Sequence, residues 1–289
     1  MVEVGKTAGF CGGVSLCVKR LNEEIDSNDV VYCLGEVVHN KDVVSDFENK
    51  GVVFVDELDL VPDNSIVAFR AHGVVKSIYD EAERRGMKIV DLTCPKVFNI
   101  RNIVKPYLED SYVILIAQKS HPEALSTISF CGENSCIVED ISDLDDVVGI
   151  IKDFDRVVVI AQTTFNEEKF LKYCDVIRDS YLGELIIKNT ICNATHIRQE
   201  ETREMAKNKD TMIIIGGKNS SNTRKLYDIS SEFCSNTLIC ENVSDLDISK
   251  VFGNVGIMAG ASTPKNIIDE VFKAVSKSLR FLCHVSEIM

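Results

Sequence analysis

The chain of 289 residues lacks any apolar run long enough to cross a bilayer. Its start also lacks the basic residues and apolar stretch of a signal peptide, because Glu3 and Gly5 interrupt it. We therefore expect a cytoplasmic protein without a membrane partner. Positive charge is scarce too: 32 Lys and Arg stand against 45 Asp and Glu, a net charge of −13. Because phosphate contacts need clustered Lys and Arg, this balance disfavours a nucleic-acid partner.

Two common nucleotide-binding motifs are missing. No Gly-x-Gly-x-x-Gly follows a predicted strand, so a nicotinamide or flavin site is unsupported. The segment 216–220 is not a P-loop, because Lys218 is followed by Asn and no glycine stands at position 212. The chain therefore offers no recognisable site for a redox nucleotide.

The residues that are present favour an α/β protein. Short runs rich in Val and Ile alternate with helical patterns, as is typical of parallel α/β modules. The predicted strands are 30–34, 66–69, 88–91, 112–117, 157–161, 184–188, 211–215 and 255–259. The predicted helices include 13–26, 97–109, 166–179, 195–208, 221–233 and 264–278.

Three of the eleven cysteines repeat one context, since each stands where a predicted strand ends and a helix begins. They are Cys11, Cys94 and Cys192. A polar loop follows each cysteine after 27 or 28 residues, at His39, His121 and Ser220. A second polar loop follows after 61 to 70 residues, at His72, Thr163 and Ser262.

This threefold register predicts three similar parallel-sheet α/β modules in a pseudo-threefold arrangement around one centre. In parallel sheets, ligands collect at the carboxyl ends of the strands, where all nine repeated positions fall. We expect the modules at residues 13–93, 94–191 and 192–282. An N-terminal strand within residues 1–12 would complete the third module.

Cysteines in a cytosolic chain are expected to be reduced thiols or metal ligands, and disulfides are not expected. Three thiolates from separate loops could hold zinc, although structural zinc usually takes closely spaced cysteine pairs. They could also hold a [4Fe-4S] cluster. Such a cluster commonly takes four thiolates, so three would leave one iron open. We interpret the remaining cysteines as buried apolar residues (Cys17, Cys33, Cys174, Cys234, Cys240 and Cys283) or turn-flanking thiols (Cys131 and Cys136).

The motifs around these positions resemble the 4-hydroxy-3-methylbut-2-enyl diphosphate reductase family. They run in order from the first dozen residues to about position 264, so the resemblance covers nearly the whole chain. The matching segments are 9–14 (GFCGGV), 36–40 (EVVHN), 71–74 (AHGV), 93–95 (TCP), 121–123 (HPE), 162–164 (QTT), 191–195 (ICNAT), 218–222 (KNSSN) and 259–262 (AGAS). Any one of them is weak alone, and together they are specific.

The resemblance implies reductive removal of an allylic hydroxyl from 4-hydroxy-3-methylbut-2-enyl diphosphate, giving isopentenyl and dimethylallyl diphosphate. It implies a [4Fe-4S] cluster on Cys11, Cys94 and Cys192, whose open iron binds the substrate hydroxyl. With no nucleotide site in the chain, we expect electrons from an external donor such as ferredoxin or flavodoxin.

The resemblance also assigns roles to two residues. Glu123 would be the proton donor, which requires a raised pKa or a proton relay, and Thr163 would orient or pass the proton. Each has a plainer alternative. Glu123 could simply favour the start of a helix at Pro122, and Thr163 could cap the helix 166–179 together with Thr164.

A diphosphate needs hydrogen-bond donors, and the repeated loops contain few Lys or Arg. Imidazole, hydroxyl and amide groups together with helix N-termini can replace fixed cations. The expected substrate-binding residues are His39, His72, His121, Thr163, Ser220, Ser221, Asn222 and Ser262. Residues 220–222 could also be only a helix cap, and His196 and His284 receive no role.

Three alternatives stay open from the sequence alone. A non-redox [4Fe-4S] Lewis-acid enzyme of the quinolinate synthase type also combines three α/β modules with three cysteines. A non-enzymatic iron–sulfur sensor would need no polar pocket. The chain could also be the catalytic part of a longer protein, since some members of the resembled family carry appended RNA-binding domains.

Overall fold

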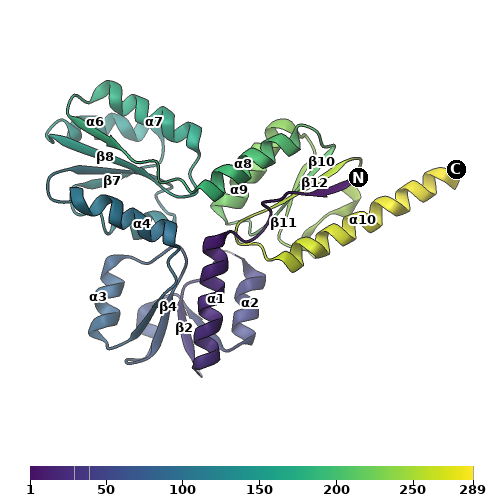
Figure 1. Ribbon diagram of the computed structural model, residues 1–289, viewed down its shortest axis with the longest axis horizontal. Coiled ribbons are helices and arrows are strands. Elements are labelled where there is room, and N and C mark those ends of the chain that lie inside the picture. The colour runs from purple at the N-terminus through teal and green to yellow at the C-terminus, as the bar shows by residue number, and fades with distance from the viewer. Residues whose placement is uncertain (29, 39, 289) are drawn as a thin grey trace. The chain divides into compact units, whose positions relative to one another are not determined.

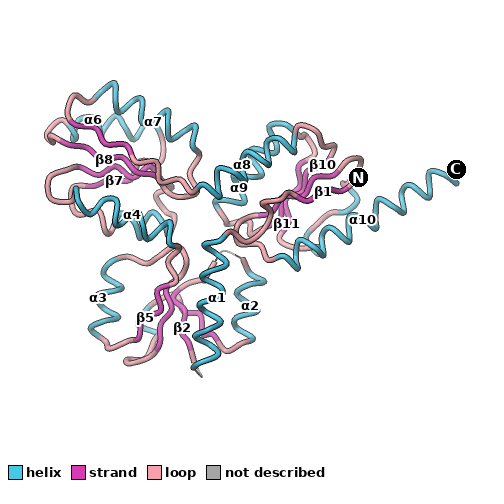
Figure 2. Tube along the Cα trace, viewed as in Figure 1, coloured by secondary structure: helices cyan, strands magenta, loops and turns pink. Residues whose placement is uncertain are grey.

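The structure is a computed structural model that describes residues 1–28, 30–38 and 40–288, with side chains described up to residue 280. Helices and strands alternate along this part of the chain (Figure 2). Its strands form parallel four-stranded sheets with the orders β1-β12-β10-β11, β3-β2-β4-β5 and β7-β6-β8-β9. The expected α/β class with parallel sheets is confirmed. None of the described helices is long and apolar enough to span a membrane.

Two compact units divide the chain. The first contains residues 1–15, 38–46 and the chain from 193 onward, and the second contains residues 16–37 and 47–192. One sheet belongs to the first unit and two sheets belong to the second. The division into modules 13–93, 94–191 and 192–282 stays a prediction.

The sheet of the first unit contains the strand that precedes Cys11. β1 (Val2–Val4) lies at the sheet edge and pairs with β12 (Val255–Ala259). Along the central β10 (Thr211–Ile215), successive side chains point to opposite faces. Ile213 packs on the side of α10 (Lys265–Ile288), and Ile214 packs on the other side with α9 (Ser221–Phe233). The edge strand β11 (Thr237–Cys240) and α8 (Asn193–Ala206) complete this part.

The first sheet of the second unit comprises β2 (Val31–Leu34), β3 (Val52–Val55), β4 (Ile66–Phe69) and β5 (Lys88–Asp91). The helices α1 (Gly12–Ser27), α2 (Lys41–Asn49) and α3 (Lys76–Arg84) are interleaved with these strands in the chain. Phe69 and Val67 are fully buried and pack with Ala82 of α3. α3 begins five residues after Ala71, so this packing anchors the loop after β4 at both ends.

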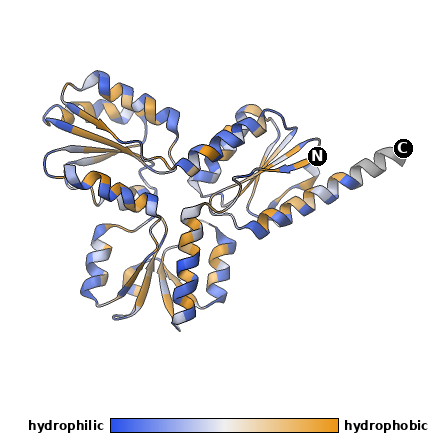
Figure 3. Cartoon of the chain, viewed as in Figure 1, coloured by the Kyte–Doolittle hydropathy of each residue, from blue (hydrophilic) through white to orange (hydrophobic). Residues whose placement is uncertain are grey.

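The second sheet of this unit is covered on both faces by helices. Its strands are β6 (Tyr112–Ile116), β7 (Ser135–Val138), β8 (Arg156–Ala161) and β9 (Glu184–Ile187). Ile114 and Ile116 face α6 (Leu144–Ile151) and α7 (Glu167–Ser180), whereas Val113 and Leu115 face α4 (Pro95–Val104) and α5 (Pro122–Ile128). Figure 1 shows α4 on one side of this sheet and α6 with α7 on the other. The apolar residues of its strands stand out in Figure 3.

Several predicted elements have the observed bounds, and others differ for identifiable reasons. The strands predicted at 66–69, 88–91, 211–215 and 255–259 are confirmed residue for residue. The helix predicted at 97–109 is wrong at both ends, since α4 begins at Pro95 and ends at Val104. Pro106 has no N–H to continue the helix, and a 3-10 turn follows at Lys105–Tyr107. The short edge strands β3, β7 and β11 were not predicted.

A core substitution should cost far more stability than the same substitution on the surface. Leu115 is fully buried in β6, and Leu182 is fully exposed. We expect Leu115→Ala to lower the free energy of unfolding by about 2–5 kcal/mol and Leu182→Ala to change it by less than about 0.5 kcal/mol. Urea unfolding of both variants measures this, and equal losses would contradict the described packing.

Candidate active site

Three loops at the carboxyl ends of strands in the second unit carry predicted site residues. His72 follows β4, His121 follows β6 and Thr163 follows β8. The rings of His72 and His121 meet edge to face, with centroids 5.4 Å apart at an interplanar angle of 82°. The structure therefore brings together side chains from two different sheets of this unit.

His121 is the cap of α5. Its Nδ1 accepts a hydrogen bond of 3.1 Å from the backbone N–H of Glu123. Because Nδ1 is an acceptor, the neutral ring carries its proton on Nε2. His121 therefore offers a hydrogen-bond donor from Nε2 while its other nitrogen holds the start of the helix.

The carboxylate of Glu123 is turned to Thr163, forty residues away in the chain. The backbone N–H of Thr163 donates to Oε1 at 2.6 Å, and the Thr163 hydroxyl donates to Oε2 at 2.8 Å. Both residues are buried, with Glu123 2% exposed. The helix start is capped by His121 and the helix α7 by Asn166, whose side chain accepts from Lys169 N–H. The side-chain caps are thus His121 and Asn166, while Glu123 lies in the first turn of α5, where an acidic residue is favourable.

Burial raises the pKa of Glu123 to about 7, although the two hydrogen bonds from Thr163 act in the opposite direction. Among the described residues no cationic partner contacts the Glu123 carboxylate, so its loss of hydration favours the neutral acid. A carboxyl with a pKa near the working pH can hold a proton and release it. The fold itself thus gives the Glu123 carboxyl the raised pKa that a proton donor requires.

The backbone of Thr163 also connects this acid to a predicted thiol ligand. The Cys192 N–H donates to the Thr163 carbonyl at 2.8 Å. Cys94 is held in a similar way, because its N–H donates to the Ala71 carbonyl at 2.9 Å in the loop that carries His72. Both thiols are half-buried. Each stands directly before a helix, Cys94 at α4 and Cys192 at α8.

Cys11 lies in the first unit and has the same local setting. It precedes α1, and its Sγ accepts from the Val14 N–H at 3.4 Å. Its own N–H donates to the carbonyl of Ala261 at 3.3 Å, next to Ser262. All three predicted ligands are therefore half-buried thiols that stand directly before a helix.

Most other described cysteines differ sharply from these three. Burial raises the pKa of four thiols to about 12, and they are Cys33, Cys131, Cys174 and Cys240. Cys17 and Cys234 are also buried, and Cys17 donates to the carbonyl of Leu92. The interpretation of Cys17, Cys33, Cys174, Cys234 and Cys240 as buried residues is confirmed, and the side chain of Cys283 lies outside the described residues.

No group of three metal-ligating side chains is assembled within the described residues. Cys11 belongs to the first unit, and Cys94 and Cys192 belong to the second. The three-thiol centre is therefore still a prediction. The donor set fits an iron–sulfur group, since cysteine thiolates are its usual ligands.

The predicted anion-binding residues of the first unit meet at the start of α9. Ser220 caps the helix, its side chain accepting from Thr223 N–H at 3.4 Å, so its capping role is real. Asn222 is 5% exposed, and neither its amide oxygen nor its amide nitrogen has a hydrogen-bond partner among the described residues. A buried amide without a partner is costly, and a bound anion beside a helix N-terminus would satisfy its N–H₂ group.

The loop after β12 packs against this helix start. A Cβ on Gly260 would lie 2.4 Å from Thr223 Oγ1 and 3.6 Å from the amide nitrogen of Asn222. Only glycine permits so close an approach. Ser262 follows in the same loop and is buried, and Ser221 is half-buried at the first turn of α9. His39 lies outside the described residues.

The sequence reasoning missed a cluster that joins the His72 loop to α5. The hydroxyl of Ser126 donates to the Val74 carbonyl at 2.9 Å and accepts from Arg101 at 3.3 Å. The Arg101 guanidinium lies 3.8 Å from the centroid of the Phe130 ring and donates to the Tyr79 hydroxyl. The surroundings of Arg101 are not visible in the sequence, because Tyr79 lies on α3, Ser126 on α5 and Phe130 in the turn after α5.

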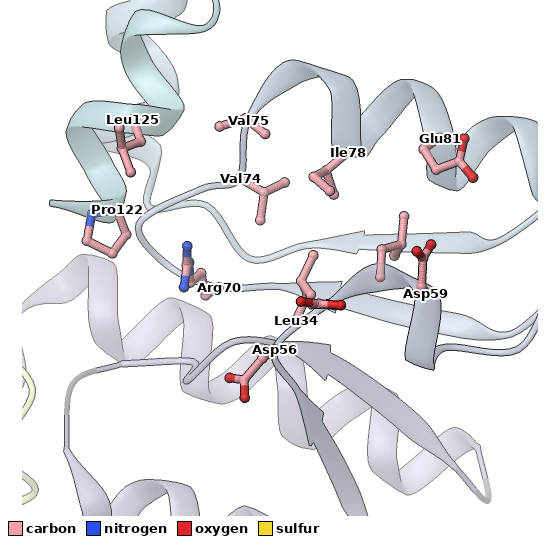
Figure 4. Close-up of a pocket in the computed structure, with 12 residues that line it drawn as sticks. Leu34, Asp56, Asp59, Arg70, Val74, Val75, Ile78, Glu81, Pro122 and Leu125 are labelled. Carbon is pink, nitrogen blue, oxygen red and sulfur yellow. The ribbon is translucent and has the colours of Figure 1, made fainter. Parts of the chain in front are cut away.

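A separate cleft of about 380 Å³ lies next to these loops (Figure 4). Its walls combine apolar residues such as Val74 and Leu125 with the carboxylates of Asp56, Asp59 and Glu81. Arg70 is the cation of this lining, and burial lowers its pKa. None of the predicted site residues lines the cleft within the described part of the chain, so it is distinct from the candidate site.

Loops at the ends of parallel strands that hold a buried acid beside paired imidazoles place this chain among the α/β enzymes. More narrowly, it belongs to the LytB protein family, whose match covers residues 2–276. The family expected from the sequence motifs is thus confirmed.

Named relatives agree with this family. The 4-hydroxy-3-methylbut-2-enyl diphosphate reductase of Clostridioides difficile (strain 630) is 38% identical over 277 residues, 93% of this chain and 97% of that protein. A solved structure of (E)-4-hydroxy-3-methyl-but-2-enyl diphosphate reductase, the terminal enzyme of the non-mevalonate pathway, is 36% identical with a TM-score of 0.72, covering 96% of this chain and 99% of that one. The E-1-hydroxy-2-methyl-but-2-enyl-4-diphosphate reductase of Plasmodium falciparum is 27% identical with a TM-score of 0.86, covering 96% and 87%.

The raised pKa of Glu123 predicts how stability depends on pH. Between about pH 4.5 and 7 the unfolded chain ionises this carboxyl and the folded chain does not, so stability falls as pH rises through this window. Glu123→Gln removes the titration. We expect the stability of the native protein relative to Glu123→Gln to fall by about 3 kcal/mol from pH 4.5 to 7. Urea titrations across this range measure the difference, and a pH-independent difference would contradict the raised pKa.

Proposed function

We propose that this chain is a 4-hydroxy-3-methylbut-2-enyl diphosphate reductase. The reaction removes the allylic hydroxyl as water, consuming two electrons and two protons, and leaves isopentenyl or dimethylallyl diphosphate. The named relatives support this assignment because they match nearly the whole length of the chain. A non-redox Lewis-acid reaction would not consume electrons, so product analysis separates the two.

The observation that carries the proposal is the buried pair of Glu123 and Thr163. The reaction needs an acid that is still protonated near neutral pH, and burial raises the pKa of Glu123 to about 7. The hydroxyl of Thr163 touches Glu123 Oε2 and is the group through which a proton can be passed or oriented. Its carbonyl accepts from the N–H of Cys192, so the acid and the thiol residue both hydrogen-bond to Thr163.

Cys11, Cys94 and Cys192 are the proposed cluster ligands. Their half-burial and helix-start positions support this role, whereas the buried thiols with a pKa of about 12 are unsuited to it. A [4Fe-4S] cluster held by three thiolates would supply the one-electron steps and a Lewis acid for the departing oxygen. We further propose that modules 13–93, 94–191 and 192–282 converge on this cluster, with residues 1–12 joined to the last.

The diphosphate would be held by uncharged or titratable donors. The candidate hydrogen-bond donors in the first unit are the amide of Asn222 and the hydroxyls of Ser220, Ser221 and Ser262. His72 and His121 meet each other in the second unit, and His121 presents its Nε2 proton. We include His39 in this set from its motif. These groups and one helix N-terminus can bind a diphosphate through hydrogen bonds without fixed cations.

An external electron donor such as ferredoxin or flavodoxin completes the proposal. The chain shows no redox-nucleotide motif, so electrons must come from another protein. A cytoplasmic location suits thiol ligands that must stay reduced.

The decisive test is anaerobic reconstitution followed by iron and sulfide counting and a turnover assay with a strong reductant. We expect about four iron and four sulfide per chain and formation of both isopentenyl and dimethylallyl diphosphate. Cys94→Ser should lose or damage the cluster, while Cys136→Ser, a change at another half-buried thiol, should keep it. Cluster-loaded protein that yields neither product would overturn the proposed function.

Glu123→Gln should slow turnover by about 10²–10⁴-fold, the contribution typical of a general acid. Cluster content and substrate affinity should stay close to those of the native enzyme, because the substitution keeps the size of the side chain. Native activity should also fall as pH rises above about 7, where Glu123 loses its proton. Unchanged turnover in the variant would mean that another group supplies the proton.

A further inference from the structure

The segment between β1 and Cys11 has no regular structure, yet it is held tightly by one side chain of α8. The Glu201 carboxylate accepts from the backbone N–H of Lys6 at 2.6 Å and from that of Thr7 at 2.9 Å. The Thr7 hydroxyl also donates to it. One carboxylate therefore satisfies two backbone donors and a hydroxyl of the loop that leads to Cys11.

A second side chain of α8 holds the carbonyls of the same segment. Arg198 donates from Nε to the Thr7 carbonyl at 2.8 Å and from Nη2 to the Gly9 carbonyl at 2.7 Å. Its side chain is buried, with 3% of its surface exposed. Arg198 and Glu201 lie three residues apart, on the same face of the helix. Together, Arg198 and Glu201 form hydrogen bonds with backbone donors and acceptors of residues 6–9.

The opposite side of the segment is fixed by the sheet and the loop after it. Gly9 N–H donates to Ala259 at 3.4 Å, and a Cβ on Gly9 would lie 2.9 Å from Ile268. The φ of Gly9 is +98°, which other residues rarely adopt. Cys11 N–H then donates to Ala261. The backbone before Cys11 has little freedom between these contacts and the two side chains of α8.

The charge of Glu201 is maintained by these same contacts. Burial alone would raise its pKa, but the hydrogen bonds from Thr7 and Lys6 outweigh burial and lower the pKa below its ordinary value. The carboxylate is therefore ionised at neutral pH, and its hydrogen bonds are charge-assisted. Such bonds are stronger than neutral ones, which suits a side chain that fixes a backbone.

The position of this pair in the chain connects it to a second thiol. α8 begins at Asn193, directly after Cys192. A helix is a rigid element with a fixed rise of about 1.5 Å per residue. The helix that begins directly after Cys192 therefore holds, through Arg198 and Glu201, the loop that leads to Cys11.

We propose that Arg198 and Glu201 are positioning residues for the cluster, which hold the loop of residues 6–9 so that Cys11 stays in place as a ligand. This inference rests on the proposed function, because it requires that Cys11 and Cys192 bind the same cluster. Neither side chain touches substrate or cluster in this role. Their removal should loosen one ligand of three and so shorten the lifetime of the bound cluster.

The test compares Glu201→Gln with Glu200→Gln, its neighbour on the same helix. Glu200 is half exposed and pairs with Arg203 on the surface, so its loss leaves residues 6–9 untouched. Glu201→Gln removes the charge and places an N–H₂ group where the backbone donors of Lys6 and Thr7 need an acceptor. Both variants and the native chain are loaded anaerobically, and the visible absorption of the cluster is followed after excess chelator is added.

We expect Glu201→Gln to lose its cluster on the order of ten times faster than the native protein, as the loss of charged hydrogen bonds implies. Glu200→Gln should match the native protein. All rates are taken at a temperature at which the cluster-free forms of each chain are folded, as judged by their thermal unfolding. Equal rates for Glu201→Gln and Glu200→Gln would overturn the positioning role and leave the proposed function intact.

A second variant covers the case in which Glu201→Gln does not fold. Arg198→Lys keeps the charge but cannot bridge the carbonyls of Thr7 and Gly9 with two nitrogens. Faster cluster loss than in Glu200→Gln supports the inference, and an equal rate overturns it. Native protein that takes up no iron at all would overturn the inference and the proposed function together.

Discussion

The contact on which the site depends is the buried pair of Glu123 and Thr163. Thr163 donates from its backbone and its hydroxyl to the two carboxylate oxygens, and its carbonyl accepts from Cys192. One residue thus contacts both the buried acid and the backbone of Cys192, directly before α8. The parallel sheet makes this possible, because the loops after β6 and β8 leave it at the same edge.

Burial raises the pKa of several acidic groups of this chain. It raises the pKa of the Glu123 carboxyl to about 7, so that this group titrates near neutral pH. It also raises the pKa of thiols such as Cys33 and Cys174 to about 12, which makes them inert. Cys11, Cys94 and Cys192 are only half-buried and stand directly before helices, so their position in the fold differs from that of the packed thiols.

Much of the fold could be predicted, because strand runs and the cysteine register are local or periodic signals. The runs at 66–69 and 211–215 are continuous apolar segments, and their bounds are confirmed. The partner of Glu123 could not be predicted from spacing. A helix-start carboxyl and a loop threonine each have a local capping explanation, and only the fold shows that His121 and Asn166 take those capping roles. The contacts of Arg198 with residues 7 and 9 are equally non-local.

The central claim is that the Glu123 carboxyl titrates near pH 7 in the folded protein, well above the pKa of an ordinary glutamate. Infrared difference spectra recorded across a pH titration measure this directly, through the C=O stretching band of a protonated carboxyl group. The account predicts a band that titrates with a midpoint near 7 and is absent from Glu123→Gln. A Glu123 band that titrates instead near the ordinary carboxyl pKa of about 4.3 would contradict it.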